Sequence, residues 1–450
     1  MKRTSPLILG TLILTATGLL SRMIGFFYRI FLSRTFGEEG MGIYQLIAPV
    51  LALSFSLSAS GIQTAISKYV ASEPSTHNRR YSFWVVLCGS LLSVTISLIL
   101  AGFVFIYSTP IASRILLEHR CAPLLRIVAL SFPFSSLHAC INGYFYGIKK
   151  TSMPAFTQVA EQIARVGSVY LIFIYAVGQG YSVTISFAVI GSIIGEIISM
   201  LISMIAIYFH FYQYKSELKM PSIQHVIGVN SSLIKLAAPL SANRVVINLL
   251  QSIEAIYIPR NLILFGATSS DALRLYGVLM GMALPLILFP SALTNSASVL
   301  LLPLVSEAES NRNDALIQKA VLKSIRYCLI LGFFCMFVFL LCGKTAGLLL
   351  FHSQIAGSYI MTLSFICPFL YIVSTLTSIL NGLGRTITTF IIQILALLIR
   401  LLFVYQAIPR IGMKGYLWGL LLSQLFLTGC CIFSLRRYLF LPCTSFQDRL

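Results

Sequence analysis

The chain has 450 residues, of which 57% are hydrophobic and only 10% are charged, and its mean hydropathy is +0.89. This composition excludes a soluble globular protein and is typical of a polytopic membrane protein. The net charge of +19 does not call for a nucleic-acid partner, because the basic residues are scattered over short connections, where they match an anionic lipid surface.

Apolar stretches long enough to cross a bilayer predict an all-α fold with about twelve transmembrane helices. The first stretch is too long for a cleavable signal and carries internal arginines. With the N-terminus inside, the inner connections hold about twice as many basic residues as the outer ones, so we expect both termini in the cytoplasm. The expected spans are 5–32, 41–70, 82–108, 124–147, 154–177, 183–211, 231–258, 274–304, 325–351, 358–381, 387–407 and 413–435.

Two arginines, Arg22 and Arg29, lie within the first apolar stretch. An arginine near the centre of a membrane helix costs about 2.5–3.5 kcal/mol on insertion scales, so such residues usually face a bundle interior or a wet cavity. We therefore predict that Arg22 faces a cavity, whereas Arg29 is close enough to the membrane surface that snorkelling is an alternative for it. Intervals of four and three place on one helical face the residues Thr11, Thr15, Gly18, Arg22, Gly25 and Arg29.

An internal repeat predicts the architecture. Five residues recur at an offset of 235: Thr151, Gln158, Arg165, Gly180 and Tyr181 return as Thr386, Gln393, Arg400, Gly415 and Tyr416. Asn142 and Gly143 recur at an offset of 239 as Asn381 and Gly382. An even number of helices separates the copies, which indicates a parallel repeat with its axis along the membrane normal.

The repeat predicts two six-helix lobes, with the substrate bound between them. We expect an N-terminal lobe over 1–212, a cytoplasmic linker over 213–230, a C-terminal lobe over 231–436 and a cytoplasmic tail over 437–450. Pro285 and Pro290 interrupt one expected helix of the second lobe and make it a candidate hinge.

Further polar groups fall inside the expected spans. Glu161 and Arg165 are four residues apart on one helix face, which favours a structural ion pair and leaves a coupling role open. The second copy keeps Arg400 but has Ala396 in place of the acid, so Arg400 is a further coupling candidate. His138 is expected to be a packed interior histidine, and Glu196 a helix–helix contact.

The seventh expected helix carries a polar face suited to a binding cavity. Arg244, Asn248 and Gln251 follow a four–three rhythm, and Glu254 lies on a broader arc of the same side. Glu254 has two equal interpretations, a substrate-binding group or a buried counter-ion for an arginine. Most of the ten cysteines fall in apolar segments, where they are packing residues rather than disulfides or metal ligands, and we expect no metal and no cofactor.

Several segments carry a family resemblance. Gly42–Gln45 and Ser60–Lys68 resemble the first hairpin of the stage V sporulation protein B family, polysaccharide-biosynthesis proteins of the multidrug/oligosaccharidyl-lipid/polysaccharide exporter superfamily. Gly143–Gly147, Gly281–Pro285 and Leu302–Ala308 are similar to later segments of the same family. The resemblance covers nearly the whole chain and lies in the ensemble of these segments.

This resemblance implies an alternating-access flippase of the bacterial plasma membrane, not an enzyme, working as a monomer. Its cargo would be an anionic undecaprenyl-diphosphate-linked glycan, in the first place lipid II, for cell-wall or spore-cortex synthesis. Ser21–Arg22 with Gly25 and Arg29 is similar to the arginine-bearing first helix of MurJ-type lipid II flippases, where arginines contribute to a central cationic cavity. The arginines of the second and eighth helices of those flippases have no counterpart at Leu53–Ser56 or Gly281–Ala283.

The first helix is therefore expected to carry more of the cationic site, with Arg244 and Arg260 as further contributors. An arginine offers a planar fork of donors suited to diphosphate oxygens. Two other classes stay open: a drug or cation exporter of the same superfamily, which needs an acidic intramembrane site, and an integral-membrane glycan enzyme, which needs carboxylates on water-facing loops. The chain has only 13 acidic residues.

Overall fold

The computed structural model describes residues 6–72, 79–212 and 223–439, and every secondary-structure element in these ranges is a helix. Two compact units make up the chain, Met1–Ile256 and Tyr257–Leu450. Their boundary falls inside one long helix, α9 (Ile223–Leu264). The lobe boundaries expected from the sequence stay a prediction, and 213–222 of the linker and 440–450 of the tail lie outside the described residues.

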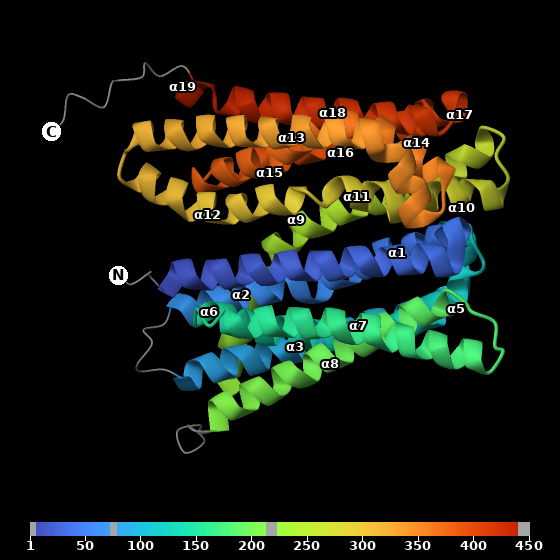
Figure 1. Cartoon of the computed structure of the whole chain (residues 1–450). Coiled ribbons are helices and arrows are strands. Elements are labelled where there is room, and N and C mark those ends of the chain that lie inside the picture. Colours follow the sequence, from blue (N-terminus) through green and yellow to red (C-terminus); the bar gives the residue numbers. More distant parts are fainter. Residues whose placement is uncertain (1–5, 73–78, 213–222, 440–450) are drawn as a thin grey trace. The chain divides into compact units, whose positions relative to one another are not determined.

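The first unit is a bundle of long helices (Figure 1). Within it, the chain passes through α1 (Pro6–Phe55), η1 (Ser56–Ser60), α2 (Gly61–Ser72), α3 (Arg79–Ile106), α4 (Ser108–Pro110), η2 (Ile111–Ile115), α5 (Cys121–Ala129), α6 (Phe132–Gly147), α7 (Ser152–Gly178), α8 (Ser186–Tyr212) and the first part of α9.

The second unit repeats this helical design with more breaks (Figure 1). It begins within α9 and continues through α10 (Ser269–Gly277), η4 (Val278–Ala283), α11 (Leu284–Leu288), α12 (Ser291–Ser310), α13 (Asp314–Phe351), α14 (Gln354–Leu363), η5 (Ser364–Ile366), α15 (Cys367–Gly382), α16 (Thr386–Gln406), α17 (Ile408–Ile411), α18 (Met413–Ser434) and α19 (Arg436–Leu439).

The number of membrane-length helices confirms the predicted class. Ten helical stretches of the described residues are long and apolar enough to span a bilayer, and the bent pair α5–α6 makes an eleventh. The first of the ten contains two expected spans, 5–32 and 41–70. They are separated by a break in α1 at Gly37, whose φ of 72° is favourable only for glycine. Lipid offers backbone groups no hydrogen bonds, so continuous helices are the stable solution for such a sequence.

The expected span 274–304 was wrong as a single helix. α11 ends at Leu288 and α12 begins at Ser291, and Pro290 occupies the N-cap position of α12. Pro285 lies in the first turn of α11, where its missing N–H costs no hydrogen bond. The two prolines therefore mark helix starts around a break, as the hinge hypothesis requires, while movement at this break stays a prediction.

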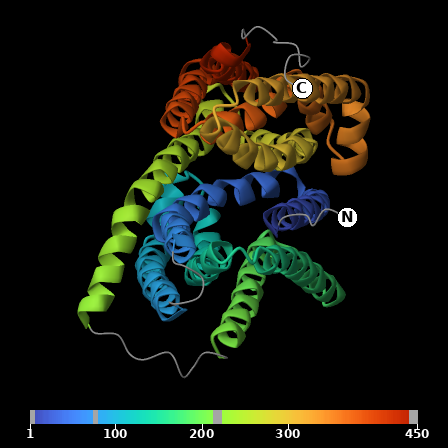
Figure 2. The ribbon, with the colours of Figure 1, turned by 90° about the vertical axis from the view of Figure 1, so that its left-hand side faces the viewer.

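Close helix contacts in the first unit depend on glycine. A Cβ on Gly143 of α6 would lie 2.6 Å from the Gln63 carbonyl oxygen of α2. α7 and α8, drawn in green, lie side by side in Figures 1 and 2, and a Cβ on Gly195 of α8 would lie 3.0 Å from the Glu161 carbonyl oxygen. Small residues thus bring the α7 and α8 backbones together at the level of Glu161.

Both units contain π-helical turns: the described residues of the first unit form η1 and η2, and those of the second form η4. A π turn leaves backbone carbonyls unpaired, and in the first unit side chains supply donors: Ser93 Oγ donates to the Ser58 carbonyl at 2.5 Å, and Asn248 Nδ2 donates to the Ala52 carbonyl at 3.3 Å. Asn248 also donates to Ser56 Oγ. The amide of Asn248 therefore holds α9 against η1 instead of standing free on a binding face.

In the second unit, a substitution at Gly347 tests the close contact between α13 and α14. α13 and α14 approach so closely that a Cβ on Gly347 would lie 2.2 Å from the Gly357 backbone nitrogen. We expect Gly347→Ala to lower the free energy of unfolding by about 1–3 kcal/mol, because backbone must move to accept the methyl group. Thermal unfolding of the purified protein in detergent measures this effect.

Gly429→Ala in α18 is the matched control, because nothing lies within 4 Å of the added methyl group. Alanine is the better helix former by about 0.5–1 kcal/mol, so this variant should unfold at the same temperature or a higher one. Equal losses of stability in the two variants would show that contact at Gly347 is not the cause.

Candidate functional site

A polar cluster lies inside the first unit, on three successive membrane helices. His138 of α6, Glu161 of α7 and Glu196 of α8 each offer a ligand atom, and these atoms lie within 4.8 Å of one another. The cluster stands where α7 and α8 approach across Gly195. The sequence interpretations of His138 as a packing residue and of Glu196 as a helix contact are therefore incomplete.

Hydrogen bonds fix His138 within this cluster. Its Nε2 lies 2.6 Å from Asn142 Nδ2 and 2.9 Å from Ser199 Oγ, and Thr157 Oγ1 is 3.4 Å away. Asn142 and His138 are one turn apart on α6, whereas Ser199 comes from α8 and Thr157 from α7. Three helices thus orient one imidazole ring.

The predicted ion pair between Glu161 and Arg165 is confirmed. Arg165 Nη2 donates to Glu161 Oε1 one turn earlier on α7, and both side chains are largely buried. The Nε of Arg165 is buried, and within residues 6–72, 79–212 and 223–439 it has no hydrogen-bond partner. In the second unit, Arg400 of α16 also has an interaction partner, although residue 396 is an alanine. The coupling role of Glu161, Arg165 and Arg400 stays a prediction.

Three side chains of α1 lie near this cluster: Tyr28, Arg29 and Tyr44. Tyr44 Oη lies 3.4 Å from Ser192 Oγ of α8, and Arg29 interacts electrostatically with Tyr44. The Tyr28 hydroxyl is buried near Tyr44 and Arg165, and none of the residues that the structure describes forms a hydrogen bond with it. Arg29 is therefore half-buried among the polar groups of the first unit. This position agrees with a buried site.

Arg22, by contrast, is exposed on α1. One turn before it, a methyl group added at Gly18 would have nothing within 4 Å, whereas Gly25 faces Gln162 of α7 at 4.0 Å. The stripe predicted as one face is thus divided: Gly25 faces α7 and Arg29 is half-buried, while Gly18 and Arg22 border open space among the described residues. Thr11 lies among residues whose side chains are not described.

The polar residues of α9 also differ in their exposure. Arg244 and Gln251 are exposed, as a binding face requires, and Glu254 is buried with 3% of its surface exposed. Asn248 is engaged with η1, so the continuous polar face expected from the four–three rhythm is interrupted. Whether Glu254 binds substrate or serves as a counter-ion stays a prediction.

Arg260, in the part of α9 that belongs to the second unit, stacks on an aromatic residue. Its guanidinium carbon lies 5.0 Å from the centre of the Tyr257 ring, which lies 4.8 Å from the Tyr405 ring. Arg260 is exposed, so its donors are accessible. A guanidinium held over a ring by a cation–π contact keeps its edge free for an anion.

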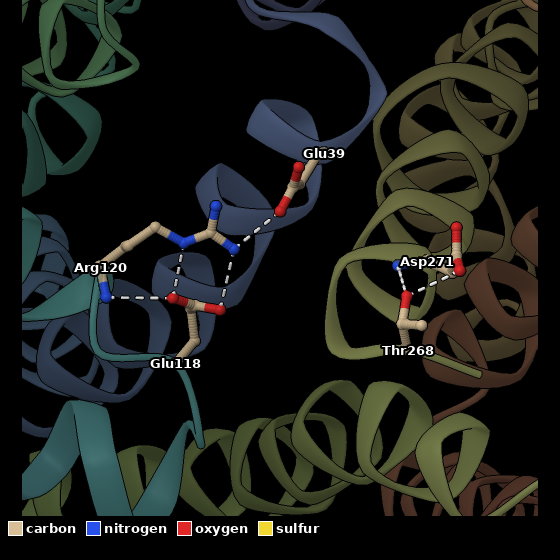
Figure 3. Close-up of polar contacts among 5 residues, drawn as sticks. All are labelled: Glu39, Glu118, Arg120, Thr268 and Asp271. Carbon is tan, nitrogen blue, oxygen red and sulfur yellow. Dashed lines mark hydrogen bonds and ion pairs between the residues drawn. The ribbon is translucent and has the colours of Figure 1, made fainter. Parts of the chain in front are cut away.

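A second charged network, outside the spans, ties the break in α1 to the loop before α5 (Figure 3). Arg120 Nε donates to Glu118 Oε1 at 2.7 Å, and Arg120 Nη2 donates to Glu118 Oε2 at 3.1 Å and to Glu39 Oε1 at 2.8 Å.

Figure 3 also shows Thr268 Oγ1 capping α10, where it accepts a hydrogen bond from the Asp271 backbone N–H at 3.1 Å.

This network predicts a pH dependence of stability. The Arg120 side chain lowers the pKa of Glu118, mainly by hydrogen bonding. A carboxyl whose folded-state pKa is lowered stabilises the fold above its unfolded pKa of about 4.3, and loses this contribution as the pH falls through the folded value. Glu118→Gln should cost about 1–2 kcal/mol at pH 7, less than a fully buried charged pair because the Arg120 side chain is 52% exposed.

Thermal unfolding at pH 7 and at pH 3 measures this contribution. We expect the difference between wild type and Glu118→Gln to shrink at pH 3. Asp271→Asn, whose carboxylate accepts a hydrogen bond from Thr268 Oγ1 at 2.7 Å, controls for general effects of removing an exposed acid. A difference that is the same at both pH values would contradict an ionic role for Glu118.

The fold and the intramembrane polar groups together define a polytopic α-helical membrane protein. The model of the family "Polysaccharide biosynthesis protein" matches residues 7–309. The chain therefore belongs to the polysaccharide biosynthesis protein family, as the resemblance of its segments predicted.

Similar proteins match nearly the whole chain. Stage V sporulation protein B of Bacillus subtilis (strain 168) is 25% identical over 414 residues, which cover 90% of this chain and 79% of that protein. Among solved structures, lipid II flippase MurJ in an inward closed conformation matches with a TM-score of 0.71 and 17% identity, over 94% of this chain and 87% of that one.

An inward-facing multidrug resistance MATE family transporter of the MOP superfamily matches with a TM-score of 0.68 and 16% identity, over 93% of this chain and 94% of that chain. At these identities the structural likeness establishes the fold alone, which this chain shares with the two solved structures.

Proposed function

We propose that this protein is an alternating-access flippase that moves an undecaprenyl-diphosphate-linked glycan, in the first place lipid II, from the inner to the outer leaflet of the bacterial plasma membrane. The process it serves is cell-wall or spore-cortex synthesis, and the relatives named for sporulation and for lipid II flipping support this assignment. Transport in this proposal involves no catalytic step and no cofactor.

The observation that carries the proposal is the exposed guanidinium of Arg22. It lies 16 residues into α1, roughly 24 Å from the helix start at 1.5 Å per residue. Neither end of the span is within easy reach of its side chain, so exposure to lipid would cost about 2.5–3.5 kcal/mol. A water-filled face next to Arg22 removes this cost and leaves the donors free.

An anionic diphosphate headgroup matches such a site. Arginine binds phosphate oxygens through two parallel N–H bonds, and these charge-assisted bonds are about twice as strong as neutral ones. The exposed Arg244 and Arg260 offer the same chemistry on α9. A membrane potential that is negative inside favours outward movement of an anion by about 2.3 kcal/mol per charge per 100 mV.

Complementation tests the cargo. In this proposal the protein inserts with both termini in the cytoplasm. Cells in which a lipid II flippase is depleted should then grow when this protein is expressed. Membrane expression without growth would reject lipid II as the cargo. Flipping of a fluorescent undecaprenyl-diphosphate sugar by the purified protein in vesicles tests the wider class, and failure of both assays would reject glycan-lipid transport.

A drug or cation exporter is the second candidate, and the acidic pair Glu161 and Glu196 inside the first unit favours it. Reversing the charge of Arg22 separates the two functions. An anion flippase should lose transport, whereas an exporter of cations should retain it.

A further inference from the structure

With both glutamates ionised, the polar cluster of His138, Glu161 and Glu196 together with Arg165 holds two negative charges and one positive charge. Arg165 is the cation that acts on both carboxylates, and it is already paired with Glu161. Arg29, on the neighbouring α1, interacts with Tyr44. If both glutamates are ionised, one negative charge is uncompensated among membrane helices, where an unpaired charge is costly. Such a cluster favours the binding of one positive charge.

Other titratable groups around the cluster do not supply that charge. α6 contributes the imidazole of His138, α7 contributes Arg165, and α1 contributes the phenols of Tyr28 and Tyr44. Phenols are neutral near pH 7, and the imidazole Nε2 of His138 lies against two hydroxyl groups and an amide. Among the described residues of the cluster, the balance is thus two carboxylates, Glu161 and Glu196, to one guanidinium, Arg165.

A buried oxygen beside the cluster has no partner in the described part of the chain. Asn142 is 8% exposed, its amide lies against His138 Nε2, and its Oδ1 has no hydrogen-bond partner among the described residues. An unpaired buried acceptor costs free energy that a ligand would recover. The Glu161 and Glu196 carboxylates, the Ser199 hydroxyl and the Asn142 side-chain amide therefore gather around the His138 imidazole.

The second copy of the repeat shows that packing does not require this arrangement. Asn381 and Arg400 correspond to Asn142 and Arg165, but Ala396 stands in place of Glu161, and the offset of 239 puts Thr377 in place of His138. In that copy the asparagine is satisfied, because Thr389 Oγ1 donates to Asn381 Oδ1 at 2.8 Å. The corresponding helices of the second copy, α15 and α16, thus pack without the acidic group, and the amide oxygen of Asn381 is paired.

We propose that His138, Glu161 and Glu196 form a site that binds a single positive charge, either a proton or a monovalent alkali cation, inside the first unit. A divalent ion fits less well, since Arg165 already neutralises one of the two carboxylates. The site is independent of the lipid that is carried, so its test requires no transport substrate.

Thermal unfolding of the purified full-length protein in detergent tests the site. A thiol-reactive dye reports unfolding, since the chain holds buried free cysteines such as Cys88, Cys140, Cys328 and Cys367. One arm replaces choline chloride by sodium, lithium or potassium chloride at constant ionic strength and pH 8.5. The other arm lowers the pH from 8.5 to 6 in choline chloride.

We expect one arm to raise the midpoint of unfolding by about 3 °C or more, because a ligand that binds only the folded state stabilises it. Glu196→Gln should abolish that response. If the ligand is a proton, this variant should unfold at pH 8.5 like the wild type at pH 6, because glutamine imitates the protonated acid. If the ligand is an alkali cation, it should unfold no higher than the cation-free wild type.

Glu307→Gln, which removes an exposed acid at the end of α12, is the matched control and should keep the full response. Ser199→Ala is a milder variant for the case that Glu196→Gln does not fold, and it should shift the half-maximal cation concentration or pH response at least threefold. A wild type that responds to neither arm, or a response unchanged in both site variants, would overturn the proposal.

Discussion

Charge reversal at Arg22 is expected to abolish glycan-lipid flipping while the protein still inserts into the membrane. Arg22 is exposed on α1, and its neighbour Gly18 borders open space, so the side chain can change without disturbing helix contacts. Loss of a bidentate phosphate contact removes about 3 kcal/mol, which corresponds to about a hundredfold lower rate, and the new carboxylate repels the headgroup as well. Vesicle flipping of a fluorescent undecaprenyl-diphosphate sugar measures the rate.

Two further variants define the role of the arginine. Arg22→Lys keeps the charge but loses the planar fork, and we expect about a tenfold lower rate. Arg410→Glu reverses an exposed arginine at the end of α17, away from the long spans, and should flip at the wild-type rate. Full activity of Arg22→Glu would remove the basis of the proposed cationic site.

Removal of Arg165 is expected to have the largest effect on stability. Its guanidinium pairs with the largely buried Glu161 and acts on Glu196, so Arg165→Met leaves two buried carboxylates without a cation. Breaking one partner of a buried ion pair costs about 3–5 kcal/mol. Thermal unfolding in detergent should show this loss as a large fall in the unfolding midpoint.

The double variant Glu161→Leu with Arg165→Met supplies the internal test, because it removes the pair without leaving Glu161 unpaired. Replacing a whole buried ion pair by apolar residues is often neutral, so we expect it to recover more than half of the loss. Arg326→Met, at an exposed arginine of α13, is the control and should change stability little. A double variant as unstable as Arg165→Met alone would show that the pair itself is not the cause.

Local patterns predicted local features well. Glu161 and Arg165 pair because residues four apart on a helix are neighbours, which depends only on helix geometry. The membrane class and the position of nearly every span follow from hydropathy in the same way. The break near Pro290 is indicated by its prolines and not by hydropathy. The π turn at Ser56–Ser60 followed from neither, since hydropathy records apolar character and not the backbone hydrogen bonds that Asn248 and Ser93 complete.

By itself, the sequence determined that this protein is an all-helical membrane protein with intramembrane arginines, because burial in lipid dictates helices and makes each charge conspicuous. Only the tertiary structure decided which charges meet. His138, Glu161 and Glu196 lie on three helices, and nothing in their spacing along the chain indicates that α6, α7 and α8 turn these side chains to one point. Helix packing, set by small residues such as Gly195, brings them within reach of one another.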